Sequence, residues 1–176
     1  MSSNRLESLV VVYTGPGKGK TTAALGMVTR ALGWGLKPAV VQYVKGKWRT
    51  GERQYFEKHP DVVFEVMGKG FTWESDDLSV DKQAAQKAWA RSSELIMSGE
   101  HAVVVLDEIT YVINYGFISC EEVVEVLQTK PDSVTVVVTG RKCPAEIVAV
   151  ADLVTEMKDE KHPYHKGYKA ARGVDF

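Results

Sequence analysis

Short runs of apolar, mostly β-branched residues recur along the chain, and polar or glycine-containing segments separate them. Strands of a parallel sheet that is covered on both faces are apolar on both sides, so they appear as continuous runs rather than as alternating patterns. The runs predict six strands, at residues 9–13, 38–43, 61–66, 102–106, 133–139 and 153–157.

Segments in which apolar residues recur at helical spacing lie between the predicted strands. They predict helices at residues 21–32, at 81–97 with a start at Ser79 or Asp81, after a capping box at Ser119, and at 144–151. Strands that alternate with helices are typical of an α/β fold. We therefore expect three layers, in which helices cover both faces of a mainly parallel sheet.

Length and composition fit one domain that spans residues 1–176. The chain is 44% hydrophobic and 26% charged, which excludes disordered, collagen-like and coiled-coil classes. It contains no apolar run of roughly 20 residues and no signal-peptide pattern, and its two cysteines cannot build a disulfide framework. These features predict a cytoplasmic protein without a membrane partner.

The charge is nearly balanced overall, with a net value of −1, but it is unevenly distributed. Residues 1–50 carry eight basic side chains and one acidic side chain, whereas residues 51–134 carry seven basic and sixteen acidic ones. A nucleic-acid-binding protein usually has a strong basic excess, so no nucleic-acid partner is expected. The basic N-terminal part instead suggests a small polyanion such as the phosphates of a nucleotide.

A glycine-rich loop, residues 15–19, connects the first predicted strand to the first predicted helix. Glycines allow backbone N–H groups to approach an anion, and the N-terminus of the following helix adds positive potential. In such a loop, Lys20 supplies a formal charge and the Thr21 hydroxyl is a ligand for Mg²⁺. The common form of this phosphate loop has four residues between its first glycine and the Gly-Lys-Thr sequence, but here only three separate Gly15 from Gly19. The loop is thus one residue short, which suggests that it holds phosphate differently from an ordinary kinase or ATPase.

Two adjacent carboxylates, Asp107 and Glu108, follow the nearly all-valine strand at residues 102–106. Ligands of open α/β sheets bind at the carboxyl ends of the strands, and Mg²⁺ prefers hard oxygen ligands there. Either carboxylate is therefore a candidate to hold Mg²⁺ directly or through water, and the sequence leaves the choice between them open.

A glycine–aromatic segment at residues 68–74 follows the third predicted strand and contains Phe71 and Trp73. Large aromatic side chains bury about 150–250 Å² each, so these two could fill the core beneath a loop. The flanking glycines favour instead a mobile loop that presents an apolar wedge to a flat ligand.

Together these segments resemble the P-loop type of ATP:corrinoid adenosyltransferase, a family that makes adenosylcobalamin. The similar segments occur in family order and cover nearly the whole chain; they are residues 14–22, 40–46, 51–53, 70–74, 105–111 and 139–141. A generic nucleoside triphosphatase would share only the phosphate loop and the acidic strand end.

The resemblance implies a RecA-like homodimer that binds ATP in a reversed orientation, together with a reduced corrinoid. It implies that Mg²⁺ (or Mn²⁺) is bound by Thr21 and Glu108, and that a reduced flavoprotein donates electrons. It implies catalytic roles for Lys20, Phe71 and Trp73, with Phe71, Trp73 and His162 at the corrinoid. The ATP-binding residues that it implies are Thr14, Gly15, Pro16, Gly17, Lys18, Gly19, Lys20, Thr21, Thr22, Arg30 and Arg141.

The expected reaction is attack of a Co(I) corrinoid on C5′ of ATP with release of triphosphate, in adenosylcobalamin biosynthesis or salvage. Two other classes share part of the pattern. A small-molecule kinase or phosphotransferase would use the same loop and Asp107-Glu108 but release ADP. A RecA-like ATPase that binds nucleic acid would need a basic groove, which the acidic middle of the chain argues against.

Overall fold

The computed structural model describes residues 8–44, 49–68 and 78–176. Its strands are β1 (Val10–Thr14), β2 (Pro38–Gln42), β3 (Val63–Val66), β4 (Val103–Asp107), β5 (Thr135–Thr139) and β6 (Leu153–Glu156). Its α-helices are α1 (Lys20–Gly33), α2 (Gly51–Phe56), α3 (Leu78–Met97), α4 (Ile109–Asn114), α5 (Cys120–Thr129) and α6 (Ala145–Val150), and a 3₁₀ helix, η1, spans Pro163–Lys166.

All six predicted strands are present, with ends within two residues of the predicted ones. The predicted start of the long helix at Ser79 or Asp81 was wrong, because α3 already includes Leu78 and both residues lie in its first turns. The sequence analysis did not predict α2, α4 or η1. Each of these spans only four to six residues, too short for a periodic pattern.

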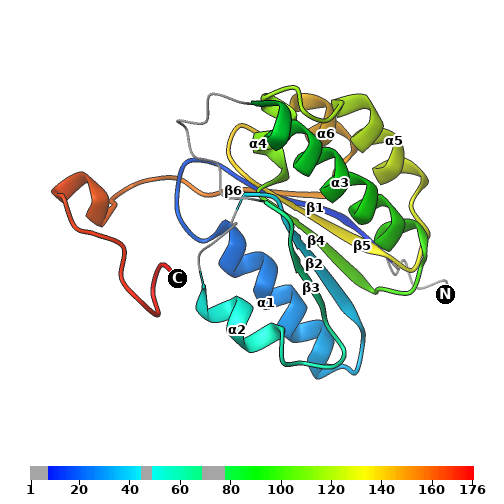
Figure 1. Ribbon diagram of the computed structural model, residues 1–176, viewed down its shortest axis with the longest axis horizontal. Coiled ribbons are helices and arrows are strands. Elements are labelled where there is room, and N and C mark those ends of the chain that lie inside the picture. The colour runs from blue at the N-terminus through cyan, green and yellow to red at the C-terminus, as the bar shows by residue number, and fades with distance from the viewer. Residues whose placement is uncertain (1–7, 45–48, 69–77) are drawn as a thin grey trace, which may run out of the picture.

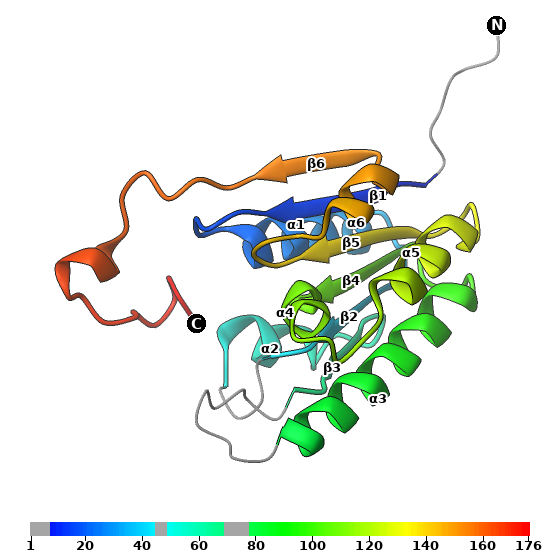
Figure 2. The ribbon, with the colours of Figure 1, turned by 90° about the horizontal axis from the view of Figure 1, so that it is seen from above.

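The six strands form one sheet in the order β3-β2-β4-β5-β1-β6, and every pair is parallel. Figure 1 shows α1 and α2 on one face and α3 to α6 on the other, which confirms the three-layer α/β prediction. In Figure 2 all strand arrows point toward the side on which the C-terminal segment lies. The carboxyl ends of the strands, and the loops that follow them, are thus gathered at one edge.

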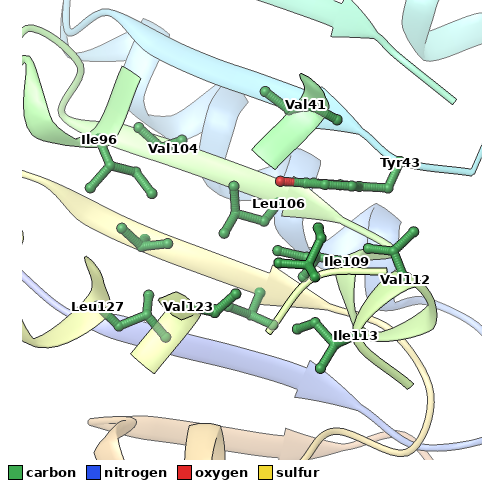
Figure 3. Packing of buried hydrophobic residues seen from close by; sticks show 14 of the residues in the cluster. Val41, Tyr43, Ile96, Val104, Leu106, Ile109, Val112, Ile113, Val123 and Leu127 are labelled. Carbon is green, nitrogen blue, oxygen red and sulfur yellow. The ribbon is translucent and has the colours of Figure 1, made fainter. Parts of the chain in front are cut away.

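Alternate residues of each central strand face opposite helical layers. Val11, Val40, Val105 and Val137 pack with buried residues of α1 and α2, whereas their neighbours pack under α3 to α6. Figure 3 shows the second cluster, in which the Tyr43 ring lies among aliphatic side chains of several elements. The Tyr43 hydroxyl, fully buried, shares a 2.7 Å hydrogen bond with Ser92 Oγ on α3.

Among the described residues, no helix is both long and apolar enough to cross a membrane. Cys120 and Cys143 are both free thiols.

Candidate active site

The glycine-rich loop connects β1 to α1 and packs against the segment that follows β6. Gly17 N donates a 2.7 Å hydrogen bond to the Met157 carbonyl, and a Cβ added at Gly17 would overlap the Lys158 carbonyl. A Cβ at Gly15 would meet the Met157 backbone in the same way. The close approach of residues 157–158 therefore requires glycine at positions 15 and 17, independently of any bound anion.

Lys20 begins α1 and folds back over the loop. Its Nζ donates hydrogen bonds to the carbonyls of Gly15 (2.9 Å) and Gly17 (2.7 Å), and the side chain is buried. Burial lowers the pKa of the Lys20 ammonium, while the nearby Glu108 carboxylate raises it and the Arg141 guanidinium lowers it. Lys20 is thus fixed within the loop, near the carboxylates of Glu108 and Asp107 and the guanidinium of Arg141.

Asp107 is the last residue of β4 and is almost fully buried. One carboxylate oxygen accepts hydrogen bonds from the hydroxyls of Thr21 (2.9 Å) and Thr139 (2.8 Å), and the other accepts one from Gln42 Nε2 (2.9 Å). These donors come from α1, β5 and β2, so Asp107 links three elements at the sheet edge and holds the Thr21 hydroxyl in place.

Glu108 follows directly, with a left-handed backbone (φ 65°), and begins the turn into α4. Its backbone N–H donates to Thr139 Oγ1 at 2.9 Å, and its side chain lines a cavity. Burial, together with the Glu108 charge, raises the pKa of Tyr111, one helical turn further along. Of the two carboxylates that the sequence left as alternatives, Glu108 is the one that faces this cavity.

The cavity has a volume of about 680 Å³, within the range of small-molecule sites. It is lined by the phosphate loop and by residues of α1, α2, the turn into α4, the loop after β5 and the C-terminal segment: Pro16–Thr22, Leu25, Gly26, Thr29, Gly51, Glu52, Phe56, Glu108, Tyr111, Arg141, His162 and Gly173–Phe176. The loop, Glu108, Arg141 and His162 were predicted from sequence, and the structure brings them together.

Three predicted nucleotide residues lie outside this lining. Thr14 ends β1, and its hydroxyl accepts a 3.3 Å hydrogen bond from Cys143 N. Gly15 contributes its carbonyl to Lys20. Arg30 is exposed in the last turn of α1, at the opposite end of that helix from the loop. Phe71 and Trp73, predicted to contact the corrinoid, lie outside the described residues.

Sequence reasoning assigned no role to three groups that line the cavity: Glu52, Tyr111 and the C-terminal residues. Glu52 lies in α2, whose first turn is capped by the Thr50 side chain, and that cap is the local signal that could have revealed it. The C-terminal residues reach the loop through an ion pair between Asp175 and Lys18. No local pattern indicates this contact, because the two residues are 157 positions apart.

The described residues contain no cluster of three or more His, Cys, Asp or Glu side chains that could hold a metal ion. Mg²⁺ bound with a nucleotide needs fewer protein ligands, because phosphate oxygens and water complete its shell. Thr21, held by Asp107, and Glu108, at the cavity wall, supply hard oxygen donors of the kind that fits this ion.

Comparisons with known proteins agree with the resemblance found in the sequence. The model of the family described as "ATP:corrinoid adenosyltransferase BtuR/CobO/CobP" matches residues 7–176. The chain belongs to this family. A corrinoid adenosyltransferase of Escherichia coli strain K12 is 42% identical over 168 residues, which cover 96% of this chain and 85% of that protein. One from a Sinorhizobium species is 46% identical over 173 residues, covering 97% and 81%.

Among solved structures, a KaiC-like protein from Pyrococcus horikoshii OT3 matches with a TM-score of 0.51. The match covers 88% of this chain and 74% of that one, at 15% sequence identity. An identity this low concerns the fold alone, and it agrees with the predicted RecA-like arrangement around a phosphate loop.

Proposed function

We propose that the protein transfers the 5′-deoxyadenosyl group of ATP to the Co(I) centre of a reduced corrinoid and releases triphosphate, in adenosylcobalamin biosynthesis or salvage. One observation carries the proposal: in an adenosyltransferase-family chain, the shortened phosphate loop, Glu108, Arg141 and His162 line a single cavity. The cavity volume of about 680 Å³ suits a nucleotide.

The proposed reaction requires no general base, because Co(I) is itself a strong nucleophile. Its electron pair forms the Co–C5′ bond, and the pair of the breaking C5′–O bond leaves with triphosphate. The protein must therefore align the reacting atoms and stabilise the charge of the leaving group. Alignment of this kind can remove about 7–11 kcal/mol of the barrier.

The positive groups of the cavity serve the leaving triphosphate in this proposal. Lys20, Lys18 and Arg141 face the cavity, and the first N–H groups of α1 have no acceptor within the helix. Preorganised donors of this type stabilise developing charge without reorganising. Thr21 and Glu108 would hold Mg²⁺, or Mn²⁺, which when bound neutralises part of the phosphate charge.

The corrinoid side of the proposal rests on the sequence resemblance and on His162, which lines the cavity. Phe71 and Trp73 would occupy the lower face of the corrinoid, exclude its lower ligand and make Co(II) easier to reduce. A reduced flavoprotein as electron donor, a homodimer and a cytoplasmic location are part of the same proposal and rest on the resemblance alone.

The proposal is tested by mixing the protein anaerobically with ATP, Mg²⁺ and chemically reduced cobalamin. We expect a light-sensitive cobalt–carbon product with one triphosphate per turnover. ADP without such a product would instead indicate a phosphotransferase. A Lys20→Met variant should lose the activity, whereas Lys87→Met, on the exposed face of α3, should keep it.

A further inference from the structure

The loop after β5 is tied to the short helix α4 by side-chain hydrogen bonds. Thr110 is completely buried, and its hydroxyl donates a 2.8 Å hydrogen bond to the Arg141 carbonyl. Asn114, one helical turn later, donates from Nδ2 to the carbonyls of Lys142 (3.1 Å) and Arg141 (3.5 Å). Both side chains thus reach from one face of α4 to two consecutive carbonyls.

The backbone of this loop lies in close contact with α4 at Gly140. Gly140 has φ 145°, in the region that favours glycine, and a Cβ added there would overlap the Thr110 hydroxyl. On its other side, Gly140 N donates to the Tyr13 carbonyl at 3.2 Å. Lys142 also has a positive φ, of 52°. The path of the loop is therefore determined by the contact with α4.

The side chain that this loop carries into the cavity is Arg141. The positive charge of its guanidinium contributes to the lowered pKa of Lys20 and opposes the rise in the pKa of Tyr111 that burial and Glu108 cause. An arginine in this place can bind phosphate oxygens through several parallel N–H groups. A fixed backbone leaves less of the residue to be ordered when the ligand binds, which favours affinity.

We propose that Thr110 and Asn114 are positioning residues that hold the Arg141 backbone so that its guanidinium faces the triphosphate chain. This inference rests on the proposed function, in which the cavity binds ATP and releases triphosphate. Glu108 is the N-cap residue of α4, so this helix would hold the Glu108 carboxylate and the neighbouring Arg141 in one fixed relation.

The test is the binding of ATP and of inorganic triphosphate, measured by calorimetry on the purified protein. Thr110→Val removes the hydroxyl at constant shape, and we expect it to weaken triphosphate binding about 3- to 10-fold, the size of one hydrogen bond. Thr110→Ser keeps the hydroxyl and should restore most of the affinity. Asn114→Ala, at an exposed position, should weaken binding about 2-fold.

The deciding measurement repeats these variants in an Arg141→Ala background. If Thr110 and Asn114 act through Arg141, neither substitution should weaken triphosphate binding further there. Ser92→Ala, which removes a buried hydroxyl on α3 away from the cavity, controls for general destabilisation and should leave affinity unchanged.

Two results would overturn the inference while leaving the proposed function intact. One is an equal loss of triphosphate affinity in the wild-type and Arg141→Ala backgrounds, and the other is unchanged affinity in both Asn114→Ala and Thr110→Val. If Thr110→Val does not fold, Asn114→Ala in the two backgrounds decides alone. If the wild-type protein binds neither ATP nor triphosphate, the proposed function and the inference both fail.

Discussion

Replacing Asp107 tests whether its buried carboxylate organises the edge of the sheet. Asp107→Ala removes the acceptor of hydrogen bonds from Thr21, Thr139 and Gln42 at a position that is 1% exposed. A buried donor left without an acceptor costs about 1–3 kcal/mol. Because the two hydroxyls can rotate and water can enter the space, we expect a total loss of about 3–4 kcal/mol rather than the full sum.

Asp107→Asn should lower the free energy of unfolding much less, by about 1–2 kcal/mol, because the side-chain amide of Gln42 can rotate by 180°. The introduced side-chain amide keeps one oxygen for the two threonine hydroxyls but presents an NH₂ group to Gln42. Gln42 Oε1 is buried and has no hydrogen-bond partner in the part of the chain that the structure describes. After a 180° turn of the Gln42 amide, this oxygen accepts the bond from the new NH₂ group.

The assay is urea unfolding at pH 7 without nucleotide, with the free energy of unfolding taken from the midpoint and slope. A double-mutant cycle with Gln42→Leu isolates the amide turn, because leucine cannot accept the new bond. In the leucine background the hydrogen bond from Gln42 Nε2 to Asp107 is already gone, so Asp107→Asn should cost about 1 kcal/mol less there than in the wild-type background, the difference between a hydrogen bond to a charged group and one to a neutral group. The reasoning is refuted if the cost in the wild-type background exceeds that in the leucine background by about 3 kcal/mol or more, as two facing NH₂ groups would cause, or if Asp107→Ala costs less than about 1 kcal/mol.

Three further substitutions probe the loop. Gly17→Ala, whose Cβ would overlap the Lys158 carbonyl, should displace the loop and weaken ATP binding more than about 10-fold in calorimetry. Burial lowers the pKa of Lys20 in the folded state, so between that lowered pKa and 10.5 the unfolded state binds more protons than the folded state. This group therefore makes the free energy of unfolding rise with pH across that interval. Lys20→Met should remove this rise, which urea unfolding at several pH values measures. Asp175→Asn breaks an exposed ion pair with Lys18, so it should change the free energy of unfolding by under about 0.5 kcal/mol. It also removes a negative charge from the cavity lining, so it should strengthen triphosphate binding about 2-fold, and high salt should abolish this gain.

Matched controls distinguish these effects from general damage. An added Cβ at Gly33, the last residue of α1 and outside the cavity lining, meets no atom within 4 Å, so Gly33→Ala should leave the loop in place and ATP binding unchanged. Lys87→Met on α3 should leave the pH profile of stability unchanged. Asp132→Asn removes an exposed charge outside the cavity lining and should not alter triphosphate binding. A control that behaved like its partner variant would contradict the corresponding prediction.

The strands and the phosphate loop could be predicted because their signals are local. Each buried strand is a nearly continuous valine run, and the loop sequence lies between a strand and a helix. The short helices could not be predicted in the same way. Helix α4 spans six residues, well below the roughly 12–15 that an isolated helix needs, so its packing against β5 stabilises it rather than its sequence.

Long-range contacts were the other part that the sequence did not reveal. The phosphate loop packs on residues 157–158, and its Lys18 pairs with Asp175, although neither segment carries a pattern that refers to the other. The glycines of the loop were interpreted as room for an anion, but Gly17 N already donates to Met157. A motif indicates which residues contact a ligand, whereas the contacts that shape the motif depend on the fold around it.

The adjacent carboxylates show how local geometry decides what composition cannot. Asp107 and Glu108 are consecutive, acidic and at the same strand end, so no sequence pattern separates them. Asp107 is still part of strand β4, where its Cα is paired with that of Gln42 on β2, and its side chain is buried between neighbouring elements. Glu108 has left the strand with φ 65°, which turns its side chain to the cavity. One residue therefore positions Thr21 and the other lines the cavity where a ligand would bind, a division set by where the strand stops.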